Sequence, residues 1–367
     1  MKNIRIITCF RSICFGLLLS ALAGCQKSDP EEVINEERYP YNCSWYGNHE
    51  LAEGPVAGPP EPRYTGEGNR IPAEFSYGLP LEVNPTNPGQ ILVGKSTWDE
   101  ATQNTRSTVV VIDLQTLQET TILEQGSFDD PHAERWDDLR WGEAGWIVAE
   151  KINDKQLYLI PPDGGSPQRL TDPVLGAFYD PCWVADGKRI LSLGDGPNGV
   201  DRRWRVLDLL GEVEKEFFLS NLPPSFVRYH QFADWRADSL LVSAEPSFRQ
   251  ALNVFRYPDM SLVKDIRVID SDSNAPVISD QEWWPGTERI LWQFYGALYA
   301  TDWQTGKTNA IWEDCEQLLQ GFAVMPNGEQ AICLFGERVA VEERGGTQYS
   351  MHLYLLELSS GVVTRIK

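Results

Sequence analysis

The sequence lacks the motifs that mark several classes of hydrolase and metal site. It has no Gly-x-Ser-x-Gly nucleophile elbow, no His-Glu-x-x-His pair and no Ser-x-Asp-x-Gly-x-x-Trp box. Its four histidines are scattered along the chain at His49, His132, His230 and His352. These absences argue against a serine hydrolase, a zinc peptidase and a sialidase. We therefore expect no catalytic residues of those types, no metal and no cofactor, and the sequence favours a protein that is not an enzyme without deciding the question.

Long apolar runs are missing as well. The longest near the start, residues 13–21, is shorter than the roughly 20 residues of a membrane-spanning helix. Lys2, Arg5 and Arg11 precede it, and this combination is typical of a secretory signal peptide.

The run ends in Leu22-Ala23-Gly24-Cys25, which resembles the lipobox of bacterial lipoproteins. The resemblance implies that residues 1–24 are a signal peptide and that Cys25 carries lipid, with palmitate among the acyl chains. We expect a secreted protein held in the cell envelope by this lipid. The outer membrane, on its periplasmic or its surface face, is the expected location.

Positive charge is scarce relative to negative charge. The chain has 32 Lys and Arg against 53 Asp and Glu, a formal net charge of −21 at pH 7. Such a chain repels nucleic-acid phosphates, so we exclude nucleic acid as a partner. Residues 25–72 are rich in Glu, Pro and Gly, which predicts an acidic tether after the lipidated cysteine. The aromatic stretch 39–46 could pack on the main domain and brace it.

Cysteine is limited to seven residues, and three of them fall in or at the end of the signal region. The other four are Cys43, Cys182, Cys315 and Cys333. In an oxidising compartment they could form two disulfides, and four buried thiols are an equally good interpretation. Their wide, irregular spacing argues against a zinc site.

What the chain does have, from residue 73 to residue 367, is a repeated hairpin. The clearest copy runs from Tyr179 to Leu191, where an aromatic closes a strand, Asp186-Gly187 forms a tight turn and an aliphatic run begins the next strand. Degenerate copies begin near residues 83, 141, 235, 284 and 322. Each copy is followed by two more strand-like runs. Six units of four strands, with a period of roughly 40–50 residues, predict an all-β fold: a six-bladed β-propeller of four-stranded antiparallel blades.

The run Asp163–Thr171, followed by Asp180–Ile190, resembles the repeat of TolB-like six-bladed propellers. In that family the aromatic is followed by Ser-Pro, where this sequence has Val184 and Ala185. The resemblance covers most of residues 73–367 and implies the fold more strongly than any activity, because propellers host many functions.

Innermost strands of a propeller line its central channel, so residues just before each repeat aromatic should lie near one channel mouth. These candidate binding residues are Asp137, Asp138, Asp180, His230 and Asp280, with Gln231 beside them. Convergent carboxylates and a histidine could bind a cation or a sugar, or act as acid and base.

We expect a lipid-anchored binding or scaffold protein that presents its propeller to a protein or peptide partner in the envelope. The alternative is a glycan-binding or carbohydrate-active propeller that uses the carboxylates at the channel mouth. The oligomeric state is not readable from the sequence.

Overall fold

The computed structural model describes residues 50–51, 63–65, 75–99, 104–125, 134–142, 145–184, 186–199, 201–218, 231–236, 240–245, 251–270, 278, 280–294, 296–314, 317–340 and 347–367. Several predictions fall outside these residues: the signal peptide, the lipidated Cys25, the aromatic stretch 39–46, Cys43, Cys315 and His230. Within the described residues, no helix is long and apolar enough to cross a membrane.

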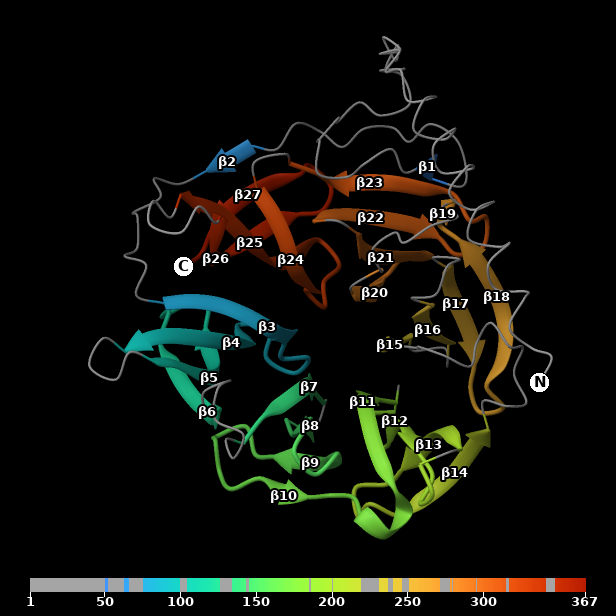
Figure 1. Cartoon of the computed structure of the whole chain (residues 1–367). Helices are drawn as coiled ribbons and strands as arrows, with labels where there is room; N and C mark the ends of the chain where they lie inside the picture. Colours follow the sequence, from blue (N-terminus) through green and yellow to red (C-terminus); the bar gives the residue numbers. More distant parts are fainter. Residues whose placement is uncertain are drawn as a thin grey trace, which may run out of the picture. The chain divides into compact units, whose positions relative to one another are not determined.

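The described strands confirm the predicted all-β propeller. Six sheets, each with four consecutive antiparallel strands, form six blades around a central axis (Figure 1). Blade 1 comprises β3 (Phe75–Val83), β4 (Gln90–Asp99), β5 (Asn104–Asp113) and β6 (Glu119–Gln125). Blade 2 comprises β7 (Trp136–Trp141), β8 (Ile147–Lys151), β9 (Gln156–Ile160) and β10 (Gln168–Arg169).

The other four blades follow in chain order, and a 3-10 turn, η1 (Pro173–Leu175), precedes the third. Blade 3 comprises β11 (Ala177–Trp183), β12 (Ile190–Asp195), β13 (Arg202–Leu207) and β14 (Val213–Phe218). Blade 4 comprises β15 (Gln231–Arg236), β16 (Leu240–Glu245), β17 (Ala251–Arg256) and β18 (Ser261–Arg267). Blade 5 comprises β20 (Asp280–Trp284), β21 (Arg289–Phe294), β22 (Ala297–Asp302) and β23 (Thr308–Trp312). Blade 6 comprises β24 (Gln317–Val324), β25 (Gln330–Ala340), β26 (Thr347–Glu357) and β27 (Val362–Arg365).

The second strand of a blade shows why these apolar runs fold as they do. Side chains along a strand alternate between its two faces. In β21, Ile290 and Trp292 pack against blade 4, whereas Leu291 packs against blade 6. Both faces of the blade are therefore buried, so the run is apolar at every position instead of at every second one.

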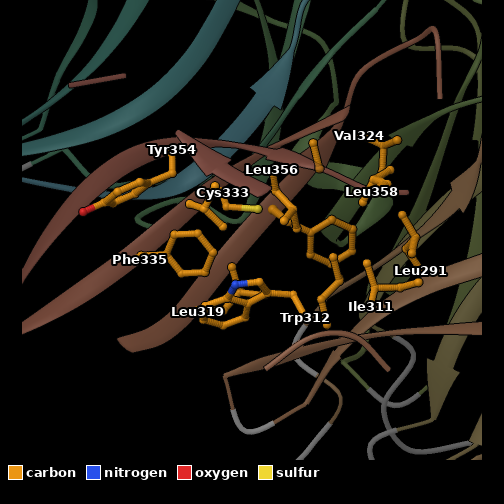
Figure 2. Packing of buried hydrophobic residues seen from close by; sticks show 14 of the residues in the cluster. Leu291, Ile311, Trp312, Leu319, Val324, Cys333, Phe335, Tyr354, Leu356 and Leu358 are labelled. Carbon is orange, nitrogen blue, oxygen red and sulfur yellow. The ribbon is translucent and has the colours of Figure 1, made fainter. Parts of the chain in front are cut away.

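Buried side chains between neighbouring blades hold the ring together. The described residues form six hydrophobic clusters, and each cluster joins two blades that are adjacent around the axis. Figure 2 shows the cluster between blades 5 and 6, where Trp312 and Phe335 lie with ring centroids 4.3 Å apart. Cys333 belongs to the same cluster, and it and Cys182 are buried free thiols. No disulfide therefore involves either of these two cysteines.

At the seam between blades 6 and 1, no strand of either blade enters the sheet of the other, because the four strands of each blade are consecutive in the chain. One hydrophobic cluster spans the seam, and the Met351 amide donates a hydrogen bond to Ser76 Oγ at 3.2 Å. Lys367 also forms an ion pair with Glu119 at 2.7 Å.

Two short strands from the segment predicted as a tether pair with the propeller. β2 (Arg63–Thr65) adds to β27 in parallel, so the blade 6 sheet gains a fifth strand. β1 (Glu50–Leu51) pairs with β19 (Ile269–Asp270). The segment 25–72 thus contributes β-structure at these two places.

Close packing between blades 2 and 3 makes a test of the fold. The Trp183 indole N–H donates to the Arg140 carbonyl at 2.9 Å, and a Cβ on Gly142 would meet the Trp183 ring at 2.4 Å. We predict that Gly142→Ala lowers the free energy of unfolding by about 1–3 kcal/mol, because overpacking forces the ring to move. Urea denaturation measures this change.

The matched control is Gly78→Ala, since a Cβ at Gly78 would meet no atom within 4 Å. Equal stability of the two variants would contradict the packing argument.

Candidate functional site

A cavity lies on the propeller axis, and the innermost strand of every blade contributes one of the residues that line it. These six residues, which we call the axial ring, are Glu82, Arg140, Cys182, Asp234, Glu282 and Ala323. They come from the innermost strands β3, β7, β11, β15, β20 and β24 (Figure 1). The cavity encloses about 140 Å³. Only the fold brings these residues together, because consecutive ring residues lie roughly one repeat period apart along the chain.

Arg140 is the cation of the axial ring. Its guanidinium donates a charge-assisted hydrogen bond to Glu82, which joins blades 1 and 2. Burial raises the pKa of Glu82 to about 7, although the positive charge of Arg140 lowers it. The negative charges of Glu82 and Asp280 raise the pKa of Arg140 above its ordinary value and outweigh burial, so Arg140 stays charged.

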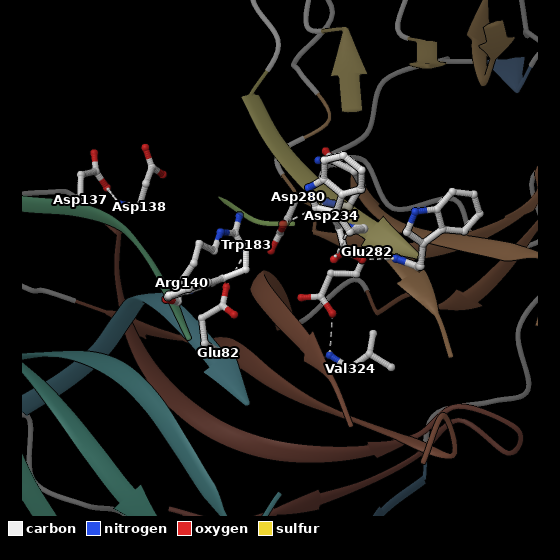
Figure 3. A network of polar contacts seen from close by, with 12 residues as sticks. Glu82, Asp137, Asp138, Arg140, Trp183, Asp234, Asp280, Glu282 and Val324 are labelled. Atoms are coloured by element: carbon white, nitrogen blue, oxygen red, sulfur yellow. Dashed lines mark hydrogen bonds and ion pairs between the residues drawn. The ribbon is translucent and has the colours of Figure 1, made fainter. Parts of the chain in front are cut away.

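The carboxylates of Asp234 and Glu282 each connect two blades. Asp234 accepts a hydrogen bond from the Trp283 amide at 2.7 Å, and Glu282 accepts one from the Val324 amide at 2.8 Å. Figure 3 shows these side chains gathered with Arg140. Burial raises the pKa of Asp234 to about 6 and that of Glu282 well above its ordinary value. The site therefore retains protons that exposed carboxylates would lose at neutral pH.

β-Bulges place a second group of carboxylates towards one mouth of the channel. In β7 the bulge lies between Asp137 and Arg140, and in β11 it lies between Tyr179 and Cys182. In each bulge, two residues lie opposite a single residue of the neighbouring strand. Asp138 and Asp180 occupy equivalent positions in these bulges, and each has φ of 46°. The left-handed conformation is tolerated by aspartate better than by most residues.

Asp138, Asp180 and Glu150 form this mouth cluster. One carboxylate oxygen from each lies within 4.8 Å of the others, and among the described residues this is the group of three acidic, His or Cys side chains close enough to hold one metal ion. Burial and the negative charges around it raise the pKa of Asp138 well above its ordinary value. Burial, with the charge of Asp138, raises the pKa of Glu150 to about 8.

The structure separates the candidate residues chosen from the sequence. Asp138 and Asp180 meet in the mouth cluster, while Asp280 lies beside the axial ring, where burial raises its pKa to about 6. Asp137 is exposed, and its Oδ1 accepts a hydrogen bond from the Asp138 amide at 3.0 Å. His230 lies outside the described residues, and Gln231 begins β15.

Sequence reasoning missed five polar residues of the two groups: Glu82, Arg140, Glu150, Asp234 and Glu282. A signal for three of them was present, because Arg140 and Asp234 directly precede the tryptophan of the repeat and Glu282 lies two residues before it. Glu150 lies on the second strand of blade 2 and reaches the mouth because it pairs with Asp137.

No protein-family profile matches the sequence, and no curated protein matches it. Among solved structures, the β-propeller domain of the Trilobed protease from Pyrococcus furiosus, which has an open velcro topology, superposes with a TM-score of 0.50 at 12% identity. The superposition covers 80% of this chain and 96% of that one. An acylaminoacyl peptidase from Pyrococcus horikoshii gives a TM-score of 0.49 at 13% identity, covering 80% of this chain and 52% of that one. The present chain thus spans about half of that peptidase's length. At these identities the likeness shows the six-bladed fold alone.

The raised pKa of Glu150 predicts how stability depends on pH. Its folded-state pKa of about 8 lies above its ordinary value of 4.5, so the folded protein binds a proton that the unfolded chain releases between these values. Its contribution is therefore fully present below pH 4.5 and is lost as pH rises towards 8. The amide side chain of Glu150→Gln cannot ionise, so this variant should melt at a higher temperature than wild type at pH 8 and at nearly the same temperature at pH 5. Each ~1 kcal/mol of stability that the variant regains at pH 8 raises the melting temperature by about 2–4 °C.

Differential scanning calorimetry from pH 5 to pH 8 measures this effect. The exposed Glu212, on the turn between β13 and β14, supplies the control Glu212→Gln. A parallel decline in wild type and Glu150→Gln would show that Glu150 ionises normally in the folded protein.

Proposed function

We propose that this chain is a lipid-anchored binding protein of the cell envelope, tethered through Cys25, whose propeller takes a protein or peptide partner at the axial channel. The motif Leu22–Cys25 supports the anchor, and the excess of acidic residues supports a partner with positive charge at its contact surface.

The axial cavity carries this proposal. It is lined by all six innermost strands, and its ring has three carboxylates against the single guanidinium of Arg140. A purely structural channel would be more stable with apolar side chains at these positions, since buried ion pairs often stabilise less than hydrophobic packing. The retained charges instead favour recognition of a charged group.

The bulge in β3 offers a way to detect the partner. Leu79 lies in this bulge, at the level that Asp138 and Asp180 occupy in their blades, and it is 56% exposed. We predict that a photo-crosslinking residue placed at Leu79 gives, in intact cells, a defined adduct whose yield falls when Asp138→Asn and Asp180→Asn are combined. Mass spectrometry identifies the partner peptide in the adduct.

Two controls accompany this experiment. The same crosslinker at Leu210, which is 83% exposed on the β13–β14 turn, should give no such adduct. Cys25→Ser should release the chain from the membrane fraction and abolish the adduct in cells. An adduct that forms equally from both positions, or none from Leu79, would argue against a partner at the channel.

The mouth cluster favours a second candidate function, a carbohydrate-active propeller. The oxygens of Asp138, Glu150 and Asp180 lie within 4.8 Å of one another, and neighbouring carboxyl groups are the acid–base pair that glycosidases use. Burial and the negative charges of Asp180 and Asp137 raise the pKa of Asp138 well above its ordinary value, which favours a protonated carboxyl that could act as a general acid.

Polysaccharide hydrolysis tests this candidate. We predict that Asp138→Asn and Asp180→Asn each lower the release of reducing ends by about 10²–10⁴-fold, the usual contribution of a general acid or base. Glu212→Gln should leave the rate unchanged. Absence of release by wild type across acidic and neutral glycans would exclude this function.

A further inference from the structure

The axial ring is separate from the mouth cluster, and its carboxylates are spaced differently. Among the described residues, only the mouth cluster brings three ligand atoms within 4.8 Å of one another. The carboxylates of Glu82, Asp234 and Glu282 therefore do not all lie within 4.8 Å of one another, as the ligands of one metal ion with bonds of about 2.0–2.6 Å to oxygen would. A positively charged nitrogen forms hydrogen bonds of about 2.8 Å, which are longer than metal–oxygen bonds, so its acceptors can lie farther apart than the ligands of a metal ion.

Hydrogen-bonding capacity remains in the cavity after the links between blades are counted. Oε2 of Glu282 accepts the Val324 amide, whereas Oε1 accepts no hydrogen bond from the described residues. Each oxygen of Asp234 accepts one backbone amide, from Trp235 and from Trp283, and each oxygen of a carboxylate can accept two. The carboxylates of Asp234 and Glu282 thus keep acceptor capacity that the described residues do not use.

The charge of the cavity is unbalanced in the same direction. Arg140 donates to Glu82, so their charges offset each other. Among the described residues, no cationic side chain donates a hydrogen bond to Asp234, Glu282 or the adjacent Asp280, although the charge of Arg140 lowers the pKa of Asp234 and Asp280. In Figure 3 these three side chains lie on the same side of Arg140, away from Asp137 and Asp138.

The size of the cavity limits the ligand. Its volume of about 140 Å³ is smaller than the roughly 300–1,000 Å³ of pockets that enclose a whole small molecule. It has room for several water molecules, and hence for a head group on a linear chain, since one water needs about 10–15 Å³ measured in this way.

We propose that the axial ring binds the primary ammonium group of an aliphatic amine, with Glu282 and Asp234 accepting its hydrogen bonds and the Arg140–Glu82 pair bordering it. This inference rests on the proposed binding function and names the chemistry of its ligand. The ammonium group belongs either to a free amine or to a lysine side chain of a peptide partner.

Ammonium binding is coupled to proton release. Burial raises the pKa of the carboxyl groups that face the cavity, Glu82, Asp234, Asp280 and Glu282. The other ionisable groups around the site are Arg140, Cys182, Asp138 and Asp180. A bound cation favours the ionised carboxylates, so protons leave as the amine enters.

Isothermal titration of the full acylated chain in detergent micelles tests the proposal with three probes. These are n-butylamine, a blocked lysine (N-acetyl-lysine N-methylamide) and the uncharged blocked norleucine. We expect saturable binding of both amines with proton release, seen as a heat that depends on the ionisation enthalpy of the buffer, and no binding of norleucine. Tighter binding of blocked lysine assigns the ammonium to a peptide, and tighter binding of butylamine assigns it to a free amine.

Isosteric variants locate the site. Glu282→Gln and Asp234→Asn keep the shape and an acceptor oxygen, and each should weaken amine binding by at least about tenfold. Glu212→Gln should bind as wild type does. Near-UV circular dichroism confirms that each variant is folded. If one variant fails to fold, the other variant, together with the proton release of wild type, still decides the outcome.

Equal binding of norleucine, binding without proton release, or unchanged affinity in folded Glu282→Gln and Asp234→Asn would overturn the proposal. The crosslinking experiment at Leu79 separates this failure from that of the proposed function. An adduct at Leu79 without amine binding rejects the ammonium site and keeps the partner, whereas the loss of both rejects the binding function as well.

Discussion

The arrangement of the channel depends on one guanidinium buried among carboxylates. The charge of Arg140 lowers the pKa of Glu82, Asp138, Asp180, Asp234 and Asp280, which belong to five different blades. Burial pushes each of these pKa values upward, and Arg140 alone does not reverse that effect. The carboxyl groups around the propeller axis are therefore partly protonated. The guanidinium of Arg140, protons and any bound cation compete for the same carboxylate oxygens.

Binding chemistry and ring assembly share the same side chains. Asp234 and Glu282 accept backbone hydrogen bonds from the next blade while presenting the rest of their acceptor capacity to the cavity. A group that is part of the joint between two blades cannot move without loosening that joint. The site is consequently rigid, which favours a ligand that fits the existing spacing of acceptors over one that requires them to converge.

The fold was readable from the sequence because each hairpin repeats one local pattern. Trp183 pairs with Ile190 across the turn that the motif predicted. Each copy of this hairpin marks the first two strands of a blade, so six copies predict six blades. The site was only partly readable. Asp138 and Asp180 were found, but the bulges in β7 and β11 shift the alternation of side chains, so the residue that faces the channel cannot be counted from the repeat. Glu82 lies in a unit with a poor match to the repeat, and Glu150 reaches the site only through strand pairing.

The seam between the first and last blades has a consequence for how the chain is made. Tyr77, Leu81 and Ile91 of blade 1 are buried by Ile332 and Leu334 of blade 6, which lie near the opposite end of the chain. A chain that emerges from the ribosome N-terminus first leaves this face of blade 1 bare until the strands of blade 6 have been made. An exposed apolar sheet face is prone to aggregation, so this face is vulnerable until blade 6 covers it.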